Sequence, residues 1–173
     1  MKQPESYEQY PTSTIVICNL VAWSIYAIGA YLLGSLWTWL LVPYLLYGLG
    51  LEVRLLRVAC VDCTYYGKAC AFGKGRLCAA AFAQGDPQRF ASREISWVDV
   101  LPDFLVSIVP LIGGIVLLAL RGWNWIVAGL LCLLLVLAFF GTGFVRGSLA
   151  CRHCKQREIG CAALDLFEGR RDG

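Results

Sequence analysis

The chain has 173 residues, of which 58% are hydrophobic and only 16% charged, and its formal net charge at pH 7 is +3. Soluble domains usually carry about 25% charged residues, so this composition excludes an ordinary soluble globular protein. The small positive charge gives no indication of a nucleic-acid partner, and we expect none. We expect an integral membrane protein of about one domain, with the lipid bilayer as its main surrounding.

A charge-free apolar segment at residues 14–36 is the first predicted membrane span. A helix of this length is about 34 Å long and crosses the hydrocarbon core of a bilayer. The alternative is a cleaved signal peptide, because the small residues at 27–30 resemble a cleavage site. The apolar stretch exceeds the roughly 7–15 residues of a signal peptide, and Glu5 and Glu8 precede it, so we expect a permanent anchor.

Three further apolar segments predict three more spans. The second starts at about residue 37 and ends near Glu52, the third covers roughly 101–120, and the fourth covers 125–145. The motif Trp-x-Trp occurs between the first and second spans and again between the third and fourth, and such tryptophans are typical of a membrane interface. The predicted fold class is therefore all-α, a polytopic membrane protein with four transmembrane helices arranged as two helical hairpins.

The distribution of positive charge predicts the orientation in the cell membrane. Four spans place both ends of the chain and the central loop on one side, and every Lys and Arg except Arg121 falls on that side. The positive-inside rule makes this side cytoplasmic. The predicted segments are an arm at 1–13, hairpin 1 at 14–56, a central loop at 57–98, hairpin 2 at 99–146 and a tail at 147–173.

Two cysteine motifs, which we call clip 1 and clip 2, have identical spacing. Clip 1 is CVDCTYYGKAC at residues 60–70 and clip 2 is CRHCKQREIGC at 151–161. Each follows a pair of spans with a Trp-x-Trp between them, in the same order and orientation. This order predicts an internal duplication related by a pseudo-twofold axis along the membrane normal, with the clips side by side. The alternative is coincidence between spans of similar composition.

The cysteines on the predicted cytoplasmic side are candidate metal ligands. Stable disulfides are rare in a reducing compartment, where Cys-x-x-Cys is more often metal-binding or catalytic. Two cysteines separated by two residues can turn both sulfurs toward one ion, and thiolates favour zinc or, as the alternative, an iron–sulfur cluster. The candidates are Cys60, Cys63, Cys70, Cys78, Cys151, Cys154 and Cys161. The remaining Cys18 and Cys132 lie inside spans, where we expect them to pack as small apolar residues.

Two ligand arrangements stay open. In the first, Cys78 completes a four-thiolate site with the three cysteines of clip 1, and clip 2 takes a fourth ligand from elsewhere. His153 is a poor candidate for that ligand, because the residues inside such a motif normally point away from the ion. In the second, the clips share six thiolates between two ions and Cys78 is surplus. The counterpart of Cys161 is either Cys70 or Cys78.

The doubled Cys-x2-Cys-x6-Cys spacing resembles that of the fungal binuclear zinc cluster. The resemblance covers only the two clips and implies a possible ligand geometry. This chain differs in having two spans between the clips and in lacking a dense basic segment, so the resemblance implies nothing about transcription.

The leading functional hypothesis is a metal-stabilised membrane scaffold or binding module, with a homo-oligomer or another membrane protein as a possible partner. The alternative is a membrane oxidoreductase that carries electrons or thiol equivalents through the clips, with Lys68 and Lys155 among the basic residues that would lower the thiol pKa values. Palmitoylation of Cys60 and Cys151 is a further reading that leaves the repeated spacing unexplained.

Three local features complete the sequence predictions. Gly67 and Gly160 precede the third cysteine of each clip, where we expect unusual backbone dihedrals. Asp86 followed by a proline predicts a helix start, with a helix through 88–97 that buries Phe90 and Trp97 in the membrane surface. Asp99, at the start of the third span, is either an intramembrane functional carboxylate or part of a solvated helix start.

Overall fold

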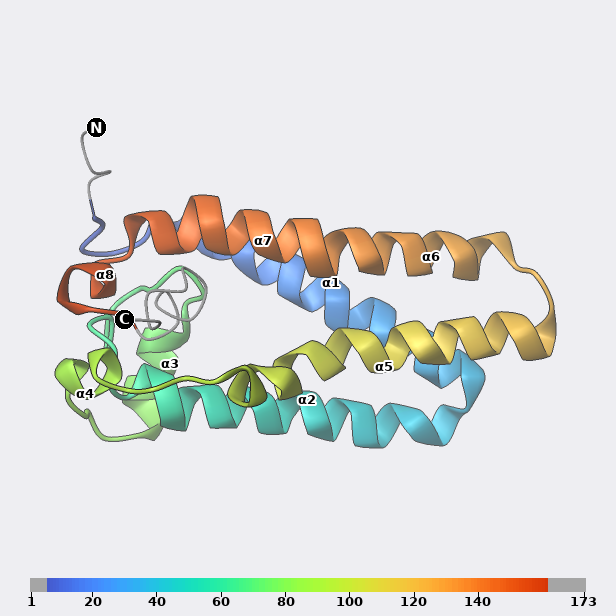
Figure 1. Ribbon diagram of the computed structural model, residues 1–173, viewed down its shortest axis with the longest axis horizontal. Helices are drawn as coiled ribbons and strands as arrows, with labels where there is room; N and C mark the ends of the chain where they lie inside the picture. Colours follow the sequence, from blue (N-terminus) through green and yellow to red (C-terminus); the bar gives the residue numbers. More distant parts are fainter. Residues whose placement is uncertain (1–5, 162–173) are drawn as a thin grey trace.

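The computed structural model describes residues 6–161, and within this range it is helical and contains no β-strand (Figure 1). Four helical segments are long and apolar enough to cross a membrane, which confirms the predicted number of spans. They are Thr12–Leu36, Thr38–Cys60, Trp97–Arg121 and Trp125–His153. Residues 1–5 of the predicted arm and 162–173 of the predicted tail lie outside the described residues.

The first and third spans are single helices, and the second and fourth are built from several helical pieces. The single helices are α1 (Thr12–Leu36) and α5 (Trp97–Arg121). The second span joins η1 (Thr38–Leu40), α2 (Leu41–Leu55) and the π-helical η2 (Leu56–Cys60). The fourth joins α6 (Trp125–Val136), η3 (Leu137–Gly141), α7 (Thr142–Phe144), η4 (Val145–Ala150) and η5 (Cys151–His153). Three short helices complete the fold: α3 (Lys74–Ala81), α4 (Pro87–Ala91) and α8 (Gln156–Ile159).

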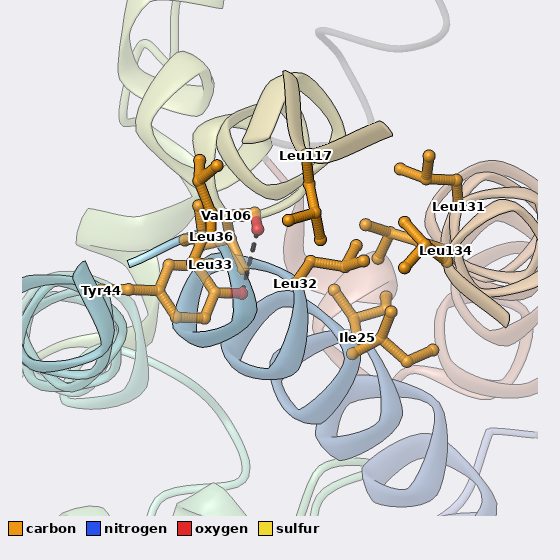
Figure 2. Close-up of a cluster of buried hydrophobic side chains, with 11 residues drawn as sticks. Ile25, Leu32, Leu33, Leu36, Tyr44, Val106, Leu117, Leu131 and Leu134 are labelled. Carbon is orange, nitrogen blue, oxygen red and sulfur yellow. Dashed lines mark hydrogen bonds between the residues drawn. The ribbon is translucent and has the colours of Figure 1, made fainter. Parts of the chain in front are cut away.

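The two single-helix spans form the centre of the bundle. Helices α1 and α5 pack against each other most extensively, and both α2 and α6 contact each of them. Figure 2 shows the core between these helices, with Leu32 and Leu33 of α1 facing Leu117 of α5 and Leu134 of α6. Leu32 and Leu134 are both fully buried.

Glycines allow the helices to approach one another closely. A Cβ atom added to Gly29 of α1 would lie 2.2 Å from Oη of Tyr44 in α2 and 2.8 Å from Cγ of Pro110 in α5. Small residues commonly play this role where membrane helices cross. Gly29 therefore fixes the point at which three helices meet.

Pro110 leaves a backbone carbonyl without a helical partner, and a tyrosine satisfies it. In an α-helix the carbonyl of Val106 would accept a hydrogen bond from the N–H of residue 110, which proline lacks. The hydroxyl of Tyr44 donates to this carbonyl at 3.1 Å, as the dashed line in Figure 2 shows. A free carbonyl is costly in a lipid environment, so this bond allows α5 to continue through the proline to Arg121.

The outer surface of the bundle is apolar and aromatic. Large side chains such as Trp23, Leu46 and Phe140 are 71%, 63% and 77% exposed, as expected for helices that face lipid. The tryptophan pairs lie at the hairpin connections, where Trp37 stacks on Trp39 and Trp123 meets Trp125 edge to face. These features, together with the four spans, indicate a membrane protein.

Helices α3, α4 and α8 gather at one end of the bundle, and the two hairpin connections lie at the opposite end (Figure 1). The first end carries both clips, and we call it the cysteine-rich end. The arm, the central segment and the described part of the tail therefore share one end, as the four-span prediction requires.

The surface helix after Asp86 is shorter than predicted. The carboxylate of Asp86 accepts a hydrogen bond from the N–H of Gln88 at 2.9 Å and starts α4, which confirms the predicted helix start. However, α4 ends at Ala91, and Trp97 is 59% exposed at the first position of α5. The prediction of one helix through 88–97 is wrong, because a second helix start interrupts it. The exposed Trp97 side chain is available to a membrane surface, so its burial there stays a prediction.

That second start involves Asp99. Its carboxylate accepts hydrogen bonds from the N–H and the hydroxyl of Ser96 at 3.0 and 2.9 Å, which forms a capping box for α5. Arg54 lies 4.0 Å from the same carboxylate. Of the two readings of Asp99, the structure supports the solvated helix start.

Candidate metal centre

The seven candidate ligands all lie at the cysteine-rich end. Cys60 is the last residue of η2, and Cys151 directly follows η4, so each clip begins at the end of a π-helical turn. Cys78 lies in α3 and is fully buried. The nine cysteines of the chain are all free thiols.

The two clips have the same backbone hydrogen bonds at their starts. The N–H of Cys63 donates to the carbonyl of Cys60 at 3.4 Å, and the N–H of Cys154 donates to that of Cys151 at 3.3 Å. The next pair corresponds as well, because Tyr66 N–H bonds to Cys63 at 2.9 Å and Arg157 N–H bonds to Cys154 at 3.1 Å. Equal spacing therefore produces equal turns around both Cys-x-x-Cys pairs.

The two glycines singled out from the sequence both adopt left-handed backbone conformations. Gly67 has a φ of +73° and Gly160 a φ of +129°. An L-residue at either position would be strained, which confirms the prediction of unusual dihedrals. Gly160 also lies against α4, where an added Cβ would be 3.0 Å from Cβ of Ala91.

Direct hydrogen bonds join clip 1 to clip 2. The side-chain oxygen of Gln156 accepts from the N–H of Thr64 at 3.0 Å. The N–H of Lys155 donates to the hydroxyl of Tyr65 at 3.0 Å, and that hydroxyl donates to the carbonyl of Tyr7 at 2.5 Å. Residues of the two clips are therefore in direct contact.

The N-terminal arm lies between the clips. The N–H of Tyr10 donates to the carbonyl of Ala69 in clip 1 at 2.9 Å, and the N–H of Tyr7 donates to that of His153 in clip 2 at 3.0 Å. The hydroxyl of Tyr10 donates to the carbonyl of Ala150. The imidazole of His153 stacks on the Tyr7 ring, with the ring centroids 4.6 Å apart. These contacts engage His153 with the arm.

Two buried polar residues of the clips were missed by the sequence reasoning. Gln156 is 1% exposed, and its amide nitrogen also donates to the carbonyls of Pro87 and Gly160 at 3.3 and 3.1 Å. Asp62 is 7% exposed and accepts from the N–H of Asp86 at 3.0 Å. Nothing in the local sequence distinguishes these residues from solvated polar side chains.

A second apolar cluster lies beneath the clips, separate from the bundle core. Its buried members include Tyr10, Cys18 and Tyr65, and three thiols of the clips pack against it. These three thiols belong to Cys63, Cys70 and Cys154. Cysteines of both clips and of α1 therefore share one apolar layer.

Burial raises the pKa values of Cys60, Cys63, Cys151 and Cys154 in the two clips. The pKa of Cys154 is raised to about 12, mainly by burial, and the neighbouring thiols of Cys63, Cys151 and Cys161 raise it further. Burial also raises the pKa values of Cys63 and Cys78. The expected lowering by lysines is therefore wrong for these thiols, and Lys68 and Lys155 instead form ion pairs with Glu8.

One buried hydroxyl lacks a partner and adjoins a candidate ligand. Oγ1 of Thr64 is buried without a hydrogen bond, and it lies where a Cys63 thiolate would accept its proton. The backbone N–H of Tyr65 lowers the pKa of Cys63, and that of Gln156 lowers the pKa of Cys154, each against the larger effect of burial. Hydrogen bonds of this kind stabilise metal-bound thiolates, so the donor set fits a thiolate-bound ion.

Within residues 6–161, no three His, Cys, Asp or Glu side chains converge closely enough to hold a metal ion. Of the clip thiols, those of Cys63, Cys70 and Cys154 pack on one apolar cluster.

A cavity of about 230 Å³ lies at the opposite end of the bundle, between α1, α5 and α6. Its lining includes Tyr31, Ser35 and Arg121 and no cysteine. Arg121 donates to the carbonyl of Leu36 there at 3.4 Å. This cavity is separate from the candidate metal centre.

No protein-family model matches the chain, and searches of curated proteins and of solved structures gave no match either.

Proposed function

We propose that the protein is a membrane scaffold or binding module whose cysteine-rich end is stabilised by a bound metal, with zinc preferred over an iron–sulfur cluster. The observation that carries the proposal is the joining of the two clips into one layer through Gln156 and Tyr65. A metal held by thiolates from both clips would connect the two hairpins at the cysteine-rich end.

The environment of the thiols supports a structural metal better than thiol chemistry. A reactive dithiol needs a low thiol pKa and access to its substrate. Burial instead raises the pKa values of Cys63 and Cys154. A metal ion bound to these sulfurs would displace their protons and offset the cost of burying the thiolates.

The buried Thr64 hydroxyl gives the metal proposal a specific chemical argument. With Cys63 protonated, Oγ1 of Thr64 has no partner. With Cys63 as a metal-bound thiolate, the same hydroxyl has an acceptor and the burial cost of an unpaired polar group is removed. The bound ion would contribute charge neutralisation and a link between the clips.

We further propose that the two hairpins are parallel repeats and that the cysteine-rich end is cytoplasmic. The equal turns in the clips and the π-helical turn that precedes the second residue of each clip support the duplication. The central position of α1 and α5, each followed by an outer span, is the arrangement that a pseudo-twofold axis along the membrane normal would give. The positive-inside rule supports the orientation.

The test is an elemental analysis of the full chain purified anaerobically in detergent, with the visible absorption of the same sample. We expect zinc, a colourless sample and a large loss of thermal stability on treatment with a chelator, because the clips would then lose their common ligand. The Cys154→Ser variant should contain less bound metal per chain. The Cys132→Ser variant should contain as much as the unmodified protein, because Cys132 lies in α6 away from the clips.

Other results would point elsewhere. Iron with acid-labile sulfide and a broad visible band would replace zinc by an electron-carrying cluster. A metal-free protein with full thermal stability would overturn the metal proposal and leave the oxidoreductase alternative.

A further inference from the structure

One positive charge stands alone at the end of the bundle that carries the hairpin connections. Arg121 is the last residue of α5, and it is the only charged residue in the stretches 9–51 and 104–145. Its guanidinium donates to the carbonyl of Leu36, the last residue of α1, at 3.4 Å. Among the described residues, no carboxylate forms an ion pair with Arg121. A guanidinium has more N–H donors than one carbonyl occupies, so Arg121 keeps both its charge and further donors for a ligand.

Arg121 lines the cavity of about 230 Å³ between α1, α5 and α6. Other lining side chains can also donate a hydrogen bond, and these are Tyr31, Ser35, Trp123 and Asn124. The remaining lining residues are apolar, and none of the lining residues is acidic. The cavity therefore combines one cation with neutral donors and has no carboxylate that would repel an anion.

The oxygen of the Asn124 side chain is already in use. It accepts hydrogen bonds from the N–H groups of Ile126 and Val127 at 2.9 and 3.2 Å, and these bonds cap the start of α6. An asparagine amide consists of an acceptor oxygen and a donor nitrogen, so the nitrogen is the part of this side chain that remains for a ligand. Asn124 therefore contributes to the cavity as a donor.

The tryptophans at this end indicate that the cavity lies at the level of the lipid headgroups. Trp123, one of the lining residues, is 67% exposed and meets Trp125 edge to face. Exposed tryptophans are typical of the boundary between hydrocarbon and water, where the phosphate groups of lipids also lie. The cavity is smaller than the roughly 300–1,000 Å³ of sites for drug-sized ligands, so it suits a ligand of headgroup size.

We propose that this cavity binds a phosphate group, with Arg121 as the cationic anchor and the neutral donors around it. The planar fork of a guanidinium matches two phosphate oxygens, and hydrogen bonds between charged groups are stronger than those between neutral groups. The phosphate belongs to a lipid headgroup or is free phosphate, and the experiment distinguishes these two sources. The inference does not depend on the metal proposed at the cysteine-rich end.

The experiment is native mass spectrometry of the full-length protein in detergent with three probes: dioleoylphosphatidylglycerol, dioleoylglycerol and inorganic phosphate. Dioleoylglycerol has the same acyl chains without the phosphate, and its binding should not depend on Arg121. We expect Arg121→Gln to weaken the tightest phosphatidylglycerol binding about tenfold or more, because charge-assisted hydrogen bonds to the phosphate are lost. Arg76→Gln is the matched control and should leave this binding unchanged. It removes the same charge from an exposed position in α3, at the cysteine-rich end.

The Asn124→Asp variant separates ligand binding from folding. Aspartate caps a helix as well as asparagine does, so the start of α6 and the thermal stability of the protein should be retained. Its carboxylate replaces the amide donor by a negative charge, so phosphatidylglycerol should bind about tenfold or more weakly. This variant decides the question if Arg121→Gln fails to fold after losing its bond to Leu36.

The outcomes also identify the source of the phosphate. Phosphatidylglycerol binding that is weakened in both cavity variants supports a lipid headgroup. An inorganic phosphate adduct that is lost in the same variants, without an effect on lipid binding, supports free phosphate. The proposal is overturned if Asn124→Asp weakens the binding of neither probe, or if Arg76→Gln weakens it equally. Dioleoylglycerol binding with the same dependence on Arg121 would also overturn it, because the cavity would then recognise something other than phosphate.

Discussion

The side chain of Gln156 in clip 2 accepts a hydrogen bond from the backbone N–H of Thr64 in clip 1 at 3.0 Å. The same side chain donates to the carbonyls of Pro87 and Gly160. One buried amide therefore connects clip 1, clip 2 and the start of α4. This connection gives the cysteine-rich end a single polar centre whose removal can be tested.

Replacing Gln156 by leucine should loosen the cysteine-rich end and leave the helical bundle intact. Three backbone groups would lose their partners, and each unsatisfied buried group costs about 1–3 kcal/mol. Hydrogen exchange should become faster in residues 60–66, while the exchange of α1 and α5 stays unchanged. Gln84→Leu is the control, since Gln84 is exposed in the same region. Equal exchange in both variants would show that Gln156 does not hold the clips together.

The Tyr44→Phe variant should be less stable, because the Val106 carbonyl would lose the hydroxyl that replaces the missing N–H of Pro110. We expect a loss of about 1 kcal/mol in the free energy of unfolding, measured in mixed micelles with increasing denaturing detergent. In the Pro110→Ala background, the alanine N–H can satisfy the same carbonyl.

The loss caused by Tyr44→Phe should therefore nearly vanish in that background. A double-mutant cycle measures this coupling directly and cancels the cavity that Pro110→Ala leaves. Additive effects of the two substitutions would contradict the role assigned to the tyrosine hydroxyl.

A methyl group on Gly29 should destabilise the bundle, because it would overlap Oη of Tyr44 and the ring of Pro110. The expected cost of Gly29→Ala is about 1–3 kcal/mol. Gly34 in the same helix is the matched control, since an added Cβ there meets no atom within 4 Å. Gly34→Ala should leave the free energy of unfolding unchanged or raise it by up to about 1 kcal/mol, through helix propensity. A similar loss in both variants would indicate that α1 packs in another way.

The alkylation of clip thiols in chelator-treated protein should have the pH dependence of buried thiols. Burial raises the pKa of Cys63 and raises that of Cys154 to about 12. Below its pKa, the thiolate fraction of each cysteine increases about tenfold per pH unit. Mass spectrometry of iodoacetamide-treated protein between pH 7 and pH 9 should therefore find rates that keep rising at both residues. A plateau below pH 8 would reveal a lowered pKa and favour the dithiol alternative.

The sequence by itself determined the membrane class, the number of spans, the end that carries the cysteines, the start of α4 at Asp86 and the left-handed glycines of the clips. These properties are local: the length of an apolar run, the preference of tryptophan for an interface, or the backbone freedom of glycine at a turn. Only the tertiary structure decided that Cys18 and Cys70 belong to one apolar cluster, that Gln156 joins the clips, and that Tyr44 satisfies the carbonyl freed by Pro110. It also decided that Cys63 and Cys154 are half-buried, with raised pKa values, although lysines lie close in the sequence. Each of these contacts and pKa shifts depends on segments that are far apart in the sequence and meet where little water is present. There, burial and hydrogen-bond partners affect a side chain more strongly than its neighbours in the sequence do.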